Sequence, residues 1–274
     1  MNVYGDVTST NMKSVRNSAR PARLGTDKPR QGQNNKLVVP VCSDRVFYEE
    51  IAPCTKIVRV IGEQEVTFLV QRTRPDWFYP CTVDDICAIL RHLPPEDVGT
   101  IHFIVLRQPT HKQRILSPVW GRAVFLYEPN FKKGYSGPAI VLEAQRLQPF
   151  KWEKAMTLDR KREFERLQKD GHRVASANHR FFILQPDAAS LRHTLLYRTL
   201  LHEIGHLVDF CAYDETAWKT RAWLQKEDFA HRYAEGAYAT LKKAGVVPFL
   251  SLFDIDAMTR EGLSPDNFLP PRKG

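Results

Sequence analysis

Alternating and continuous apolar runs indicate strands in the first half of the chain, beginning near Leu37. Residues 56–61 and 65–71 predict a hairpin that turns at Gly62. Three further apolar runs are separated by loops that contain Pro or Gly, at residues 100–107, 121–127 and 138–144. Because no helical pattern lies between them, we expect these three runs to be antiparallel neighbours. Residues 138–143 are a candidate edge strand that could pair with an extended peptide, although an inner position fits the same pattern.

Four segments have helical periodicity or helix-boundary signals, at about residues 83–92, 157–170, 187–208 and 226–243. The first begins after Thr82, whose hydroxyl can cap it. The second is rich in charge and predicts a solvent-exposed helix that ends at Gly171. The third is long, apolar and predicted to be central, and the residues after Gly245 are apolar enough to pack back on the domain. The order of strands and helices predicts one α+β domain over residues 37–274.

Basic residues are concentrated at the N-terminus. The chain has 274 residues and a net charge of +9. Residues 1–36 contain seven Lys or Arg and two Asp, a charge of +5, which leaves +4 for the rest. This segment is polar and has few large apolar side chains, so we expect a disordered basic tail. Such a tail could bind nucleic acid or an anionic surface, and its composition is also similar to that of bacterial secretion signals that are not cleaved.

The sequence pattern predicts neither a membrane-spanning helix nor a cleavable secretory signal. No apolar run approaches the roughly 20 residues that a membrane-spanning helix needs, so we expect no membrane span. The first residues lack the apolar core of a cleavable secretory signal. The five cysteines are scattered without a C-x-x-C pair, which disfavours a zinc finger and fits a reducing compartment. We therefore expect a cytoplasmic protein, or one that is exported as an effector without a cleavable signal.

The long apolar helix carries the sequence His-Glu-Ile-Gly-His at residues 202–206. Residues four apart lie one turn apart on the same face of an α-helix, so His202 and His206 can bind one zinc ion. Glu203 lies beside them, where a carboxylate can take a proton from a water that the metal has acidified. Asp209, on the same side of the helix, could orient a ligand imidazole or hold the neighbouring helix.

A catalytic zinc site needs a third protein ligand. Ala212 occupies the position at which a metzincin would have its third His, which excludes that class. Glu227 lies in the next predicted helix, which can return antiparallel against the first, and is the predicted third ligand. His231, one turn later, could ligate the metal instead or stabilise the oxyanion of the attacked carbonyl, and Tyr238 on the same face could donate a hydrogen bond to that oxyanion. Two further tyrosines compete for this role, Tyr213 and Tyr233.

Residues 202–209, together with Glu-Asp-Phe-Ala at residues 227–230, resemble the gluzincin metallopeptidases that have a short E-x-F-A ligand motif. This family includes the catalytic domain of anthrax lethal factor and the Mlc titration factor peptidases. The resemblance implies a zincin-like α+β fold, in which a small, mostly antiparallel sheet packs on the active-site helix and on a second ligand-bearing helix. It also implies His202, His206 and Glu227 as zinc ligands, with Glu203 as the general base.

These observations predict a zinc-dependent endopeptidase that hydrolyses peptide bonds of a protein substrate. One alternative is a protease that acts at nucleic acid, since the chain is basic. Another is a non-catalytic interaction module in which zinc only holds two helices together. A zinc deformylase would need a Cys ligand in a motif upstream of His202, and the sequence shows none.

Overall fold

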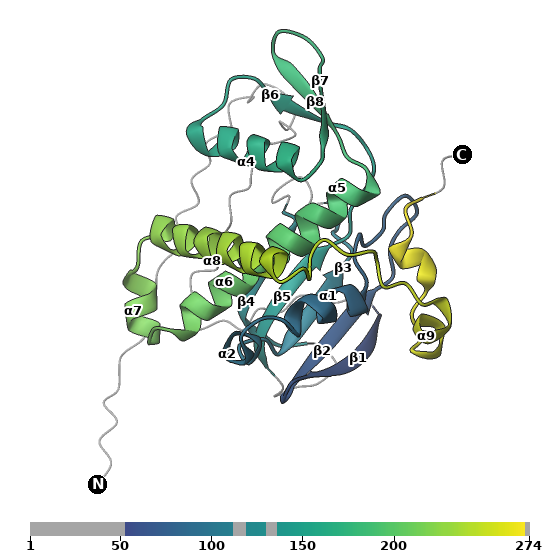
Figure 1. The fold of residues 1–274 in the computed structure, drawn as a ribbon, viewed down its shortest axis with the longest axis vertical. Coiled ribbons are helices and arrows are strands. Elements are labelled where there is room, and N and C mark those ends of the chain that lie inside the picture. Colours follow the sequence, from purple (N-terminus) through teal and green to yellow (C-terminus); the bar gives the residue numbers. More distant parts are fainter. Residues whose placement is uncertain (1–52, 112–118, 130–135, 272–274) are drawn as a thin grey trace, which may run out of the picture. The chain divides into compact units, whose positions relative to one another are not determined.

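A five-stranded sheet forms the centre of the part of the chain that the computed structural model describes, residues 53–111, 119–129 and 136–271 (Figure 1). Its strands are β1 (Cys54–Ile61), β2 (Gln64–Gln71), β3 (Phe103–Arg107), β4 (Gly121–Tyr127) and β5 (Gly137–Glu143). β1 and β2 form the predicted hairpin. The α+β class is confirmed, whereas the predicted tail of residues 1–36 lies outside the described residues, as do residues 37–52.

The sheet is mixed rather than mostly antiparallel, and its strand order is β1-β2-β3-β5-β4. β2 and β5 both run parallel to β3, and β4 is antiparallel to β5. The connection from β2 to β3 contains two helices, α1 (Val83–Leu90) and α2 (Pro95–Val98), which allow a parallel return. Residues 138–143 fall in β5, which pairs on both sides, so the expectation of an edge strand there is wrong. Among the described strands, β4 is the edge strand next to β5.

Helices pack against one face of this sheet. The N-cap predicted at Thr82 is present and is part of a capping box, since Thr82 and Asp85 exchange hydrogen bonds of 3.0 and 2.9 Å between side chain and backbone. The later helices are α6 (Leu200–Cys211), α7 (Glu215–Thr220), α8 (Trp223–Lys243), α9 (Ile255–Arg260) and the 3₁₀-helix η2 (Pro265–Phe268). The last two pack onto the main core through Met258 and Phe268, as expected for the C-terminal residues. No helix in the described ranges combines the length and apolar character that crossing a membrane requires.

The predicted long helix is a continuous helical run of three parts. These are α5 (Ala188–Arg192), a π-helical segment η1 (His193–Thr199) and α6. Apolar periodicity does not predict the π-helical segment, because buried positions recur in both types of helix. A π-turn holds more residues than an α-turn, so it changes the direction in which the following side chains point. The π-helical segment thereby helps to set the faces that His202 and His206 present.

A second, three-stranded antiparallel sheet lies between β5 and α5 in the sequence (top of Figure 1). Its strands are β6 (Phe150–Glu153), β7 (Arg173–Ser176) and β8 (Phe181–Gln185), in the order β6-β8-β7. One face packs on α4 (Leu158–Lys169) through Trp152, Phe164 and Leu184. The predicted charged helix is confirmed as α4, but the sequence analysis predicted none of these three strands, which are only four or five residues long.

Candidate metal centre

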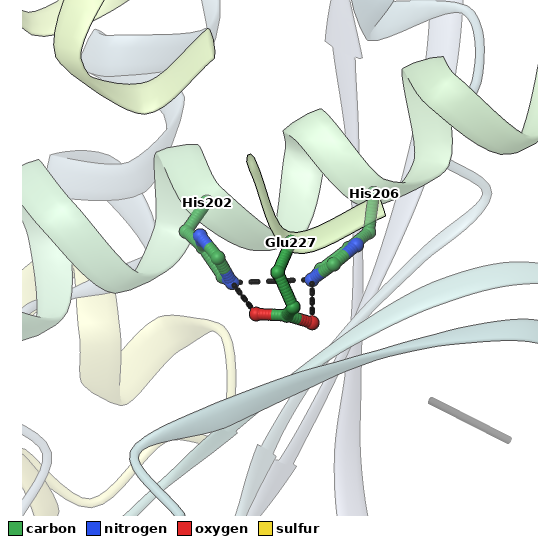
Figure 2. Close-up of side chains that lie close together, drawn as sticks. All are labelled: His202, His206 and Glu227. Atoms are coloured by element: carbon green, nitrogen blue, oxygen red, sulfur yellow. Dashed lines mark hydrogen bonds and ion pairs between the residues drawn. The ribbon is translucent and has the colours of Figure 1, made fainter. Parts of the chain in front are cut away.

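Two histidines on α6 face each other one turn apart (Figure 2). The Nε2 atom of His202 lies 3.1 Å from the Nε2 atom of His206, and both side chains are buried. Leu201 and Ile204 of the same helix belong to the core that α6 shares with the sheet. The helical spacing in the sequence therefore places both imidazoles on one face, as predicted.

Glu227 joins the two histidines from α8, and the two helices approach closely at Gly205. A Cβ atom at Gly205 would lie 3.0 Å from the Cα atom of Ala230 and 3.0 Å from the Cβ atom of Tyr233. A larger residue at this position would therefore force the helices apart. Gly lowers helix propensity in a helix interior, so its presence in the motif was a signal of close packing. The sequence analysis missed this role because the partner helix is distant in the chain.

The carboxylate of Glu227 faces both imidazoles (Figure 2). Its Oε1 atom lies 3.3 Å from Nε2 of His206, and its Oε2 atom lies 3.6 Å from Nε2 of His202. Ligand atoms that surround a tetrahedral zinc ion at about 2.0–2.1 Å are roughly 3.3 Å from one another, so these spacings fit such an ion. We call His202, His206 and Glu227 the metal group, because their ligand atoms lie close enough to hold one ion. Two imidazoles and one carboxylate suit zinc and other divalent transition metals.

Polar atoms of the metal group are buried without hydrogen-bond partners. These atoms are Nδ1 of both His202 and His206 and also Oε1 of Glu227, which lies 3.3 Å from Nε2 of His206 but without hydrogen-bond geometry. Burial alone would raise the pKa of Glu227, but the neighbouring imidazoles lower it to about 2. Burial alone would lower the pKa of His206, whereas the carboxylates of Glu227 and Glu203 raise it. The metal group is therefore arranged around a positive charge, either a proton or a metal ion.

Glu203 is almost completely buried and reaches the edge strand β4. Its Oε2 atom accepts a hydrogen bond of 2.7 Å from the backbone N–H of Ala123. Burial raises the pKa of the Glu203 carboxyl, although the charges of His202 and His206 oppose this shift. The contact fixes the carboxylate between the metal group and the edge of the sheet. A main-chain donor has no sequence signature, so the motif alone could not identify Ala123.

His231 packs against the metal group without belonging to it. Its ring centroid lies 4.4 Å from that of His202, and its Nε2 atom accepts a hydrogen bond of 3.4 Å from Nη1 of Arg166 on α4. Burial, together with the charges of His202 and Arg166, lowers the pKa of His231 to about 3, so the ring is neutral at neutral pH. The atoms that could hold one ion come from His202, His206 and Glu227, which does not support His231 as a ligand. Its oxyanion role stays a prediction.

The structure does not bring Tyr238 to the metal group. Eleven residues separate it from Glu227 on α8, which corresponds to about 16 Å along the helix. Its hydroxyl lies 3.2 Å from Nε2 of His193 instead. The competing Tyr233 donates a hydrogen bond of 2.6 Å to the carboxylate of Asp97 on α2. Tyr238 lies on the same face of α8 as Glu227, but it is too far along the helix axis to reach the metal ligands.

Asp209 holds the segment that precedes α8. Its Oδ1 atom accepts a hydrogen bond from Nη1 of Arg221, and the guanidinium of Arg221 lies 4.3 Å from the ring centroid of Tyr213. Of the two roles expected for Asp209, the structure thus shows the contact with the neighbouring segment. The ring of Tyr213 therefore contacts Arg221.

A second group of buried polar side chains lies at the start of the same helical run. Asp170, which follows α4, contacts three side chains of η1: Nδ1 of His193 at 3.1 Å, Oγ1 of Thr194 at 2.7 Å and Nε of Arg198 at 2.8 Å. Nη1 of Arg198 also donates to both carboxylate oxygens of Glu163, at 2.9 and 2.8 Å. We call these five residues the Asp170 cluster. The sequence analysis missed the cluster, because Glu163 and Asp170 looked like ordinary members of a charged surface helix.

Comparison with known proteins gives no relative from which a role could be transferred. The chain matches no protein-family model, no curated protein and no solved structure. The metal group, the carboxylate of Glu203 and the position of β4 are therefore the evidence on which a function can be based.

Proposed function

We propose that the protein is a zinc-dependent metallopeptidase with a zincin-like fold that hydrolyses internal peptide bonds of a protein or peptide substrate. The observation that carries the proposal is the convergence of the metal group from two helices beside the buried carboxylate of Glu203. His202, His206 and Glu227 would be the three protein ligands. Three such ligands leave a coordination position for water or substrate, as in catalytic zinc sites.

Glu203 moves protons in this proposal. A zinc ion held by the metal group would polarise the carbonyl of a peptide bond and acidify an attacking water. The Glu203 carboxylate would accept a proton from that water and donate it to the nitrogen of the leaving amine. The hydrogen bond from Ala123 holds Oε2 in place and leaves the other oxygen for proton transfer, so the side chain needs no reorientation.

The edge strand β4 is the proposed binding site for an extended substrate. Ala123 pairs with Ile140 in the ladder, while its N–H is directed to Glu203. Backbone groups on the unpaired side of β4 would bind a peptide by strand addition. His231 is the proposed oxyanion donor, because it adjoins His202 whereas Tyr238 lies farther along α8.

Digestion of a peptide mixture derived from a whole proteome tests this proposal, with the cleaved ends identified by mass spectrometry. Glu203→Gln is the matched control, because it keeps the shape of the side chain and all three ligands but removes the base. We expect new peptide ends with the zinc-loaded wild type and a rate lower by roughly 10²–10⁴-fold with Glu203→Gln. Equal cleavage by both proteins, or no cleavage by a wild type that contains zinc, would contradict the proposal.

A non-catalytic zinc site is the second candidate function. All three ligand side chains are buried, and an ion bound to them would join α6 to α8 as structural sites join their elements. On this hypothesis, chelation lowers the melting temperature while Glu203→Gln changes no function of the protein. The two candidates therefore differ in the effect of one substitution that leaves the metal group intact.

A further inference from the structure

The positive charge outside the N-terminal tail is concentrated in the segment that forms the small sheet and α4. Residues 150–185 contain nine Lys or Arg and five Asp or Glu, a net charge of +4. Residues 1–36 contribute +5 of the total of +9, so all other residues together are neutral. The small sheet and α4 thus account for all of the net positive charge outside residues 1–36.

Cations of the small sheet are mostly outside ion pairs. In contrast, several arginines that pack on the five-stranded sheet are bound to carboxylates, as in the pairs Arg59–Glu261, Arg107–Glu143 and Arg192–Asp85. Four cations of the small sheet and its hairpin form no ion pair within the described ranges: Lys151, Lys154, Arg173 and Arg180. Arg173 is near enough to the Asp187 carboxylate for its charge to contribute to the lowered pKa of that group, after the hydrogen bonds from Ser190. Without a carboxylate within ion-pair distance, these cations remain available to an anion from solution.

One face of the small sheet is open and combines cations with apolar side chains. Lys151 of β6 is paired with Ile183 of β8, and Ile183 with Ala175 of β7. Side chains alternate along a strand, so Phe181 and Arg173 point to the same side as these residues. Lys151, Arg173 and Ala175 are exposed. The Nζ atom of Lys151 lies 5.9 Å from the ring centroid of Phe181.

The opposite face is already occupied, so only this one can receive a partner. Trp152 and Leu184 on that side pack on α4. On the open side, β6 and β7 are two strand spacings apart, about 10 Å, with the partly exposed Phe181 and Ile183 between them. The open face is therefore a short apolar strip with Lys151 and Glu153 along one side and Arg173 along the other, since Glu153 pairs with Phe181 in the ladder.

We propose that this open face binds single-stranded nucleic acid. A base would stack on the ring of Phe181, and the phosphates on either side would contact Lys151 and Arg173. Arg180, at the hairpin between β7 and β8, would extend the cationic surface along the strand. Base stacking needs unpaired bases, which favours a single strand over a duplex. The inference does not depend on the metal group.

An acidic protein segment is the competing partner, and the apolar strip argues against it. A carboxylate-rich peptide would be attracted by Lys151 and Arg173 but would leave Phe181 and Ile183 without a partner of matching chemistry. Nucleic acid supplies both an anion and a flat aromatic surface. The unpaired main-chain edge of β7 takes no part in the proposed binding.

Fluorescence anisotropy with a labelled 20-nucleotide single strand tests the proposal on the full chain over a salt series. Lys151→Glu/Arg173→Glu should weaken binding more than tenfold at 0.1 M salt and reduce the salt slope by about 1.4, since each phosphate contact contributes about 0.7 for single strands. Phe181→Ala should weaken binding about tenfold, through the loss of one stacked base. Lys242→Glu/Lys243→Glu at the end of α8 makes the same change in net charge on exposed residues and should alter binding by less than about threefold.

The controls make each outcome informative. Melting temperatures of all variants should stay near that of the wild type, since the substituted residues are on the surface. An equal loss for the two double variants would show that only net charge matters and would overturn the proposal. So would equal affinity for a hairpin duplex, or tighter binding of a polyglutamate peptide, and the latter would identify an acidic protein as the partner. Binding that is lost in Arg20→Glu/Arg23→Glu but unaffected in Lys151→Glu/Arg173→Glu would assign it to the tail instead.

Discussion

One helical run, from η1 to α6, carries two buried polar clusters whose charges are compensated in different ways. In the Asp170 cluster, all four carboxylate oxygens of Asp170 and Glu163 contact a donor from η1. In the metal group, Oε1 of Glu227 lies 3.3 Å from Nε2 of His206 and accepts no hydrogen bond. Donors of η1 thus satisfy both carboxylates of the first cluster, although Nη2 of Arg198 has no partner, whereas the Glu227 carboxylate and the two Nε2 atoms lie close enough together to bind an added positive charge. This difference separates a structural network from a ligand site more clearly than burial does, because both are buried.

The largest effect on stability should come from Asp170→Ala. The substitution leaves the mostly buried Arg198 with only one of its two carboxylate partners and removes the acceptor for Thr194. We expect the free energy of unfolding to fall by about 3–5 kcal/mol, measured by denaturant titration. Asp159→Ala on the exposed side of α4 is the control and should change it by less than about 0.5 kcal/mol.

This pair of variants also tests the comparison. Folded Asp170→Ala should retain the zinc content of the wild type, because the Asp170 cluster contributes no ligand to the metal group. Loss of zinc from folded Asp170→Ala would show that the two clusters are not independent.

Acid should destabilise the Asp170 cluster through His172, whose Nε2 atom lies 2.9 Å from Oγ1 of Thr194. Burial lowers the pKa of His172 to about 4; Asp170 and Asp187 oppose this shift, while Arg198 adds to it. Between pH 6.5 and 4 the unfolded chain therefore binds a proton that the folded chain does not, so the free energy of unfolding falls as the pH falls. The contribution is at most about 3 kcal/mol and is complete below pH 4.

Denaturant titrations of wild type and His172→Gln at a series of pH values measure this contribution. The difference in free energy of unfolding between the two proteins should change across the window from pH 6.5 to 4 and be constant on either side. A difference that does not vary with pH would mean that His172 is protonated equally in both states.

A smaller effect is expected where α6 and α8 touch. Gly205→Ala places a Cβ atom 3.0 Å from two atoms of α8 and should lower the free energy of unfolding by about 1–3 kcal/mol and weaken zinc binding. Gly236→Ala is the control within α8, because no atom lies within 4 Å of its added Cβ. It should stabilise the protein by about 0.5–1 kcal/mol. If Gly205→Ala left stability and zinc affinity unchanged, the close approach of α6 and α8 would not be what sets the geometry of the metal group.

Local spacing explains why part of the site could be predicted from the sequence. The pair His202 and His206 depends only on the pitch of one helix, and the sequence determines that pitch through apolar periodicity. Glu227 required one further assumption, an antiparallel return of the next predicted helix, which the structure contains. Tyr238 shows the limit of the same reasoning, because a helix face extends much farther than one active site.

Features that depend on long-range pairing could not be predicted. The position of β5 inside the sheet depends on its pairing with β3, and its apolar pattern fits an inner strand and an edge strand equally. The contact between Ala123 and Glu203 uses a backbone donor that every residue but proline has. The Asp170 cluster depends on η1, whose π-helical geometry leaves no mark in the apolar periodicity.

The most direct test of the central claim is the zinc content of protein purified from zinc-replete cultures, measured by mass spectrometry. Wild type and Glu203→Gln should contain about one zinc per chain, and folded His202→Ala and Glu227→Ala should contain almost none, because each lacks one of three ligands. A wild type without zinc, or full zinc content in both ligand variants, would contradict the assignment of the metal group.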